Sequence, residues 1–178
     1  MKNNNLFVKI VQFLLVNSFI FWLGSYISRH LAIYQLFEPE GLVLRSIYNA
    51  ENLKTVWITI SPLIVSNLIA FPIFIVLFAV YLVVSKTSLK REGWLFISAI
   101  LIFVTAPFEI FLLLKDYKII LLIYSSTFDS TKVLELVRER LNILSSFSLI
   151  EIFSYLAIIF LTILKPLSKS DENKREGT

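Results

Sequence analysis

The stretch that decides the fold is residues 94–114, WLFISAILIFVTAPFEIFLLL. It can cross a bilayer as a helix, because a span needs about 20 consecutive, mostly apolar residues. Three further stretches qualify, at residues 6–28, 62–84 and 147–164. Lipid forces each backbone N–H and C=O group to bond within its own segment, so these stretches are predicted to be helical despite their many β-branched and aromatic residues. The sequence therefore predicts an all-α integral membrane protein with four transmembrane helices.

The composition supports a membrane protein. Of the 178 residues, 57% are hydrophobic and 17% are charged, whereas soluble proteins have about 45–50% apolar and about 25% charged residues. A soluble domain of this size has too much surface for its volume to hide so many apolar side chains. Basic residues stand in short runs beside apolar segments, which favours lipid head groups as partners and argues against nucleic acid.

Residues 6–28 share an apolar character with secretory signal peptides. Their apolar run is longer than the usual 7–15 residues or so, and it contains Lys9, Gln12 and Asn17. We therefore expect this segment to remain in the protein as the first membrane helix.

The connections between the spans differ in length and character. The connection between the second and third spans, residues 85–93, is short, so these two spans are predicted to form an antiparallel hairpin. Residues 42–49 are predicted to form a short surface helix. In the third connection, residues 130–145 combine apolar residues at helical spacing with a charged face. This pattern predicts an amphipathic interfacial helix that lies along the membrane or over the bundle.

Proline and tryptophan residues suggest where the spans begin and end. Ser61 and Pro62 have the character of a helix N-cap and first helical residue, so the second span is predicted to begin there. Trp22, Trp57 and Trp94 are predicted to lie at head-group level, where such aromatic residues are enriched.

The domain organisation follows from these spans. Residues 1–167 are predicted to form a single four-helix transmembrane domain, and residues 168–178 a disordered, charged C-terminal tail. Four spans place both termini on one side of the membrane. The basic residues of that side lie close to the span ends, whereas those of the other side are spread over longer loops, so the positive-inside rule predicts that both termini are cytoplasmic.

Polar residues of four different spans are predicted to converge on the outer side of the membrane. Glu109 lies inside the third span, where a carboxylate is costly and is by default a functional candidate. The other members of this candidate intramembrane cluster are Glu151, Arg29, His30 and Asn67. Such residues also make structural hydrogen bonds between helices. The sequence favours the structural reading of Glu109 over a ligand-binding or ion-binding one.

Motifs for common chemistry are absent from the sequence. There is one histidine, no cysteine, no HExxH motif, no P-loop, no GxGxxG and no GxSxG. We therefore predict no catalytic residue, no metal site and no cofactor, and we favour a non-catalytic protein over an enzyme.

Three functions remain open on the sequence. The first is an accessory or scaffold subunit of a membrane assembly, whose partners are the lipid bilayer and either another membrane protein or further copies of this chain. The alternative is a small ion-coupled transporter that uses the intramembrane carboxylate of Glu109. The third is an intramembrane lipid-modifying enzyme in which Glu109 is the general acid or base, assisted by His30 or Glu151.

Overall fold

The described part of the chain folds into five helices. The computed structural model describes residues 6–49, 51–85, 87, 89, 91–143 and 147–168. The helices are α1 (Leu6–Tyr34), α2 (Leu53–Val84), α3 (Gly93–Ile123), α4 (Ser130–Ile143) and α5 (Phe147–Leu164), and these described residues form no β-strand. The helices α1, α2, α3 and α5 are each long and apolar enough to cross a membrane. The prediction of an all-α membrane protein with four transmembrane helices is therefore confirmed.

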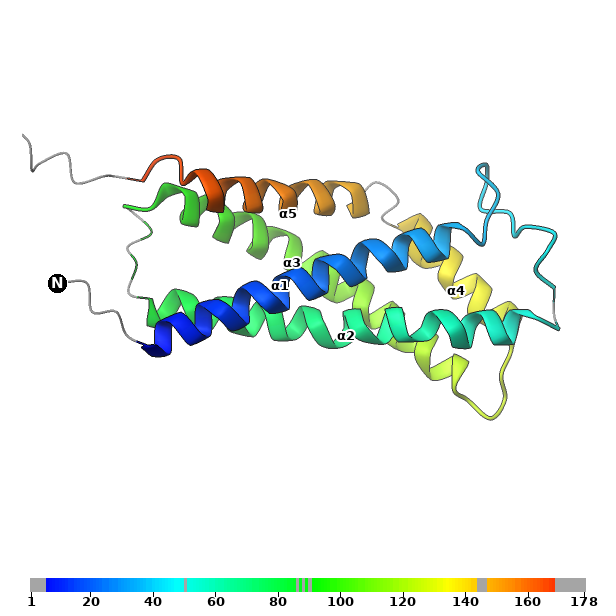
Figure 1. Cartoon of the computed structure of the whole chain (residues 1–178). Helices are drawn as coiled ribbons and strands as arrows, with labels where there is room; N and C mark the ends of the chain where they lie inside the picture. Colours follow the sequence, from blue (N-terminus) through cyan, green and yellow to red (C-terminus); the bar gives the residue numbers. More distant parts are fainter. Residues whose placement is uncertain are drawn as a thin grey trace, which may run out of the picture.

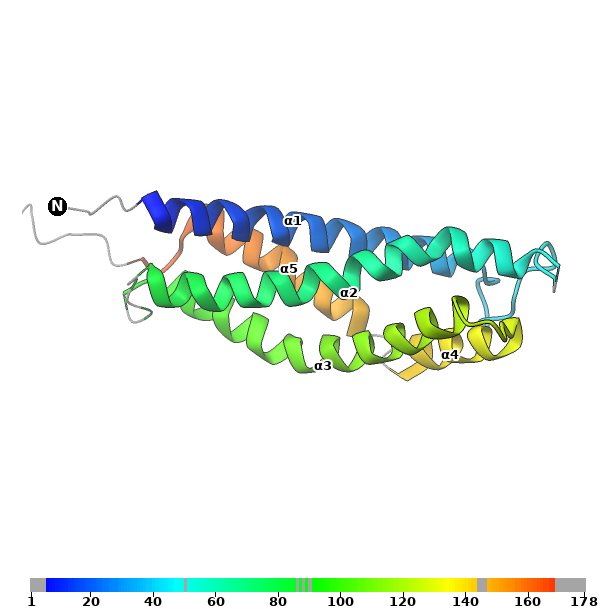
Figure 2. The ribbon, with the colours of Figure 1, turned by 90° about the horizontal axis from the view of Figure 1, so that it is seen from below.

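The helices run back and forth along one axis (Figures 1 and 2). Helices α1, α2 and α3 alternate in direction, and α4 and α5 then follow one another on the way back along α3. The first helix begins and the last helix ends at the same end of the bundle, which we call the terminal end. Of the predicted tail, residues 169–178 lie outside the described residues.

Helix lengths show that the bundle is longer than a bilayer is thick. Helices α1, α2 and α3 have 29, 32 and 31 residues, or about 44–48 Å at 1.5 Å per residue. Helix α5 has 18 residues, or about 27 Å, which matches a hydrocarbon core of about 30 Å. The first three helices therefore extend beyond α5, and α4 occupies the fourth position beside their extensions (Figure 1).

Several predicted boundaries are wrong. Helix α2 begins at Leu53, so Ser61 and Pro62 lie inside it and do not start it. Residues 42–49 form turns and no helix. Helix α3 continues to Ile123, well past residue 114. In each long helix the extension packs against a neighbouring helix, and this tertiary contact stabilises helix where the apolar run alone does not require it.

Two hydrophobic cores follow one another along the bundle. The first core joins α1, α2, α3 and α5, with Trp22, Phe71 and Tyr155 at its centre. The second core joins the extensions of α1, α2 and α3 to α4 and contains Trp57. Trp22 and Trp57 are fully buried, so both indoles face the protein interior, and their predicted place at head-group level stays a prediction. Each indole fills helix-packing space that its large apolar area suits.

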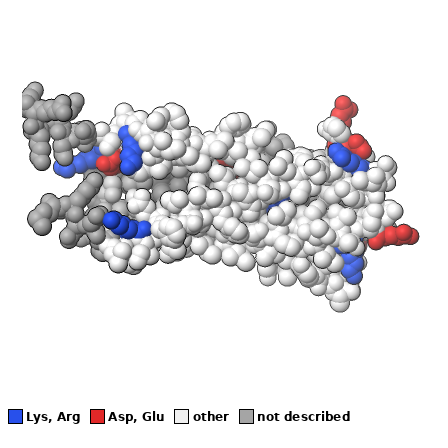
Figure 3. Space-filling view, viewed as in Figure 1, with Lys and Arg blue, Asp and Glu red and all other residues white. Residues whose placement is uncertain are grey.

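Helix α4 is amphipathic, and its apolar face covers the bundle. Val133, Val137 and Leu141 are buried in the second core, whereas Lys132 and Glu135 are exposed. The predicted helix is therefore present, but its position at the membrane interface stays a prediction. In Figure 3 the charged side chains gather at the two ends of the molecule, with only traces between them.

Candidate functional site

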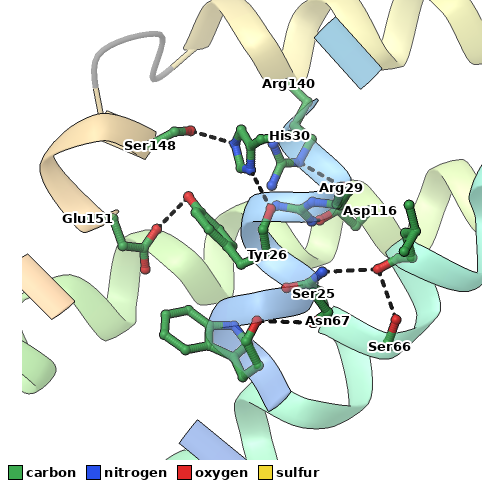
Figure 4. A network of polar contacts seen from close by, with 12 residues as sticks. Ser25, Tyr26, Arg29, His30, Ser66, Asn67, Asp116, Arg140, Ser148 and Glu151 are labelled. Atoms are coloured by element: carbon green, nitrogen blue, oxygen red, sulfur yellow. Dashed lines mark hydrogen bonds and ion pairs between the residues drawn. The ribbon is translucent and has the colours of Figure 1, made fainter. Parts of the chain in front are cut away.

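A cluster of buried charged residues lies where the two cores meet. Asp116 of α3 is its centre, and each of its two carboxylate oxygens forms an ion pair with a different arginine (Figure 4). Its Oδ2 pairs with Nη1 of Arg29 from α1, and its Oδ1 lies 2.7 Å from Nε of Arg140 from α4. Arg29 and Asp116 are fully buried, and Arg140 is 3% exposed. One carboxylate therefore ties three helices together.

A second set of contacts attaches α5 to α1. The hydroxyl of Tyr26 donates to Oε2 of Glu151 at 2.7 Å. Nδ1 of His30 lies 3.0 Å from the backbone oxygen of Tyr26, and Nε2 lies 2.8 Å from Oγ of Ser148. A carbonyl oxygen can only accept, so Nδ1 carries the proton and Nε2 of the neutral ring accepts from Ser148. Figure 4 shows these side chains reaching across from α5 to α1.

Glu109 is the least satisfied member of the cluster. It is fully buried, and neither of its carboxylate oxygens has a hydrogen-bond partner in the described part of the chain. Its electrostatic neighbours are Arg29, Arg140, Asp116 and Glu151. A buried carboxylate of this kind is costly unless nearby charges or a bound proton compensate it.

Helical spacing explains why these groups share one place. Glu109 and Asp116 are two turns apart on the buried face of α3. On α4, Arg140 follows Val133 and Val137 at the spacing of one helix face, so the guanidinium is carried inward with the apolar side chains. We call Arg29, His30, Glu109, Asp116, Arg140 and Glu151 the ionic cluster.

Charge around Arg140 keeps this side chain in its cationic form. Burial on its own would lower the pKa of Arg140. The negative charges of Asp116 and Glu109 act in the opposite direction, and the pKa is raised above its usual value. Arg140 is therefore a permanent cation inside the protein.

Four of the five residues predicted for the polar cluster come together as expected. Arg29, His30, Glu109 and Glu151 all belong to the ionic cluster. Asn67 is also fully buried, but its Nδ2 donates to the backbone oxygen of Leu63 on its own helix. Among the described residues, no hydrogen bond joins Asn67 to the ionic cluster.

Asp116, Arg140 and the bridging Tyr26 are not among the residues predicted for the cluster. In the sequence, Asp116 and Arg140 fall in connections outside the predicted membrane spans, where charged residues are common. Their positions on the helices could have identified them. Asp116 lies seven residues after Glu109, and Arg140 lies three residues after the apolar Val137. Both spacings place a charge on the buried face of a helix.

The cluster has the composition of an ion-pair network. In the described ranges, no three histidine, aspartate or glutamate side chains are grouped so that they could hold a metal ion. Two hollows in the described structure, one between α1 and α5 and one on α4, are lined by residues outside the ionic cluster. No protein-family model, curated protein or solved structure matches the chain. The site's chemistry therefore has to be argued from its own contacts.

Replacing Asp116 with asparagine tests the structural weight of the cluster. Asp116→Asn keeps the side-chain shape but leaves two buried guanidinium groups with one fewer counter-charge, so the free energy of unfolding should fall by about 3–5 kcal/mol. The measurement is thermal unfolding in a mild detergent.

Asp129→Asn is the matched control. Asp129 forms an exposed ion pair with Lys132 at 3.7 Å and caps α4, and asparagine caps helices equally well, so the loss should stay below about 1 kcal/mol. Equal losses in the two variants would show that the buried triad has no special role.

Proposed function

We propose that the chain is a non-catalytic subunit of a larger membrane assembly, in which it acts as an accessory or scaffold protein. The observation that carries this proposal is the direction of the charges in the ionic cluster. Arg29, Asp116 and Arg140 are turned toward one another across three helices and are buried. Enzymes and transporters present their charged groups to a pocket or path that a substrate can enter. An enclosed network instead fixes the relative positions of helices.

The end of the bundle opposite the terminal end offers a surface for a partner outside lipid. Helix α4 carries exposed charges of both signs, Lys132, Glu135 and Glu139. It is anchored there by Arg138, whose Nε donates to the backbone oxygen of Leu42 at 3.1 Å, and by the Lys115–Glu139 ion pair at 2.7 Å. Charges of both signs that are held in fixed positions on a helix favour binding to one complementary protein surface over non-specific binding.

Extraction in a mild detergent at native abundance, followed by native-size analysis and mass spectrometry, tests this proposal. We expect the chain to migrate with a second membrane protein at a fixed ratio. The double charge reversal Lys132→Glu with Glu135→Lys should weaken this association at least tenfold while thermal unfolding is unchanged. Arg91→Glu, at the terminal end, is the control and should leave the association intact. A chain that migrates alone would overturn the proposal.

A second function is favoured by one observation, the pair of buried carboxyl groups Glu109 and Glu151. The ionic cluster contains two arginines and three carboxyl groups, so full ionisation gives a net charge of −1. A neutral site in low dielectric therefore holds one proton, and Glu109 and Glu151 are the two carboxyl groups of the cluster without a described ion pair. Proton-coupled carriers use such groups.

Proton flux into vesicles separates the two functions. If the chain is a scaffold, vesicles that contain the wild type, Glu109→Gln or the exposed-loop control Glu40→Gln should all show the flux of empty vesicles. Glu109→Gln should also keep its partner, because glutamine removes only the charge. A flux that is present in the wild type and in Glu40→Gln, and lost in Glu109→Gln, would make the carrier the better proposal.

We further propose that both termini are cytoplasmic. The support is the density of basic residues at the terminal end, where Lys9, Arg91 and Lys165 lie at helix ends. Because the chain has no cysteine, a single introduced thiol reports its own side. Glu40→Cys should react with a membrane-impermeant maleimide in intact cells, and Lys174→Cys only after permeabilisation. The reverse pattern would invert the orientation.

A further inference from the structure

A hollow in the terminal half of the bundle lies outside the ionic cluster. It has a volume of about 350 Å³ and is bounded by α1, α2, α3 and α5. Phe74, Phe78 and Ile102 form its buried floor. Its rim includes Ile20 of α1, 64% exposed, and Ile163 of α5, 73% exposed. Helices α1 and α5 make few contacts with one another, so this hollow, which we call the α1–α5 cleft, opens between them toward lipid.

The walls of the cleft suit an apolar ligand. The hydroxyl groups of Ser98 and Thr162, which line it, donate to the backbone oxygens of Trp94 and Ile158 on their own helices. These donors are therefore already used. The remaining lining is almost entirely aliphatic and aromatic. A flexible hydrocarbon chain matches such a surface through van der Waals contact alone.

The size of the cleft selects a single chain over a helix. A helix with its side chains is about 10–12 Å wide, whereas an extended acyl chain is much thinner. The cleft is bounded by side chains of α1, α2, α3 and α5, so an acyl chain can lie between them and a whole helix cannot enter without moving α1 and α5 apart.

Positive charge lies at the end of the bundle that holds the cleft. Trp94 lines the cleft, and Nζ of Lys165 lies 5.7 Å from the centroid of its ring. Lys9 and Arg91 are also exposed at this end. The one carboxylate among the described residues of this end, Glu92, accepts from Nε1 of Trp94 and from Oγ of Ser168. The three cations thus outnumber the carboxylate.

We propose that the α1–α5 cleft binds an anionic phospholipid, with one acyl chain in the cleft and the phosphate head group beside Lys165. Basic pockets between membrane helices hold anionic head groups in this way. The ammonium group of Lys165 lies over the indole of Trp94 at the edge of the cleft, and from there it can also reach the phosphate of a lipid whose acyl chain occupies the cleft. The bound lipid fills the gap that separates α1 from α5 at the cleft. This proposal is independent of the scaffold function.

Trp94 provides an optical probe for the lipid. The chain is reconstituted into phosphatidylcholine vesicles that contain either phosphatidylglycerol or phosphatidylcholine brominated near the head-group end of the acyl chain. The fluorescence of Trp94→Phe is subtracted from that of the wild type, because Trp22 and Trp57 also emit. At equal mole fraction, brominated phosphatidylglycerol should quench the Trp94 signal at least threefold more strongly than brominated phosphatidylcholine.

Two pairs of variants locate the interaction. Lys165→Gln should abolish the preference for phosphatidylglycerol, whereas Lys118→Gln, outside the cleft lining, should not. Val16→Phe, on the cleft rim, should weaken quenching by both lipids, and the matched Val76→Phe, exposed but outside the cleft, should not. Equal quenching by the two lipids in the wild type would overturn the anionic specificity. Quenching that disappears as the protein-to-lipid ratio rises would assign the cleft to a second copy of the chain and overturn the proposal.

Discussion

Asp116 between Arg29 and Arg140 is the interaction on which the rest of the structure depends. Each arginine alone, at such depth, would carry a desolvation cost of several kcal/mol that no apolar contact offsets. The carboxylate makes both tolerable at once, and in doing so it sets the register of α1, α3 and α4. Apolar contacts in the two hydrophobic cores are non-directional, so on their own they would allow the helices many relative positions along the bundle. The ion pairs allow only one of these positions.

The same layer separates two environments. On the terminal side, α1, α2, α3 and α5 bury their aromatic side chains in the first core and expose apolar ones outward, as a lipid solvent requires. On the other side, α4 buries Val133 and Val137 and exposes Lys132, Glu135 and Glu139. The first three helices contribute to both cores.

Sequence reasoning predicted the elements dictated by solvent and missed those dictated by neighbours. The span at residues 147–164 is confirmed as the helix α5, because lipid leaves a segment of that length no other structure. The early part of α2 and the late part of α3 are buried in the second core, together with the end of α1 and with α4, and no local pattern reveals these contacts. For the candidate site, Glu109 was conspicuous because of its depth, whereas Asp116 and Arg140 were not, because they lie where charge is common. Only the relative placement of α3 and α4 makes them partners.

The order in which the chain is synthesised gives the buried triad a further meaning. Arg29 emerges first and Asp116 much later, and Arg140 arrives only with α4, near the end of the chain. A nascent protein that holds α1 to α3 therefore carries the Arg29–Asp116 pair but lacks the second cation, the contacts to α5, and the cover that α4 provides. Until α4 and α5 have been synthesised, Asp116 lacks one of its two cations and Glu109 lacks part of the positive charge that compensates its burial. A chain that stops before α4 therefore cannot complete the ionic cluster.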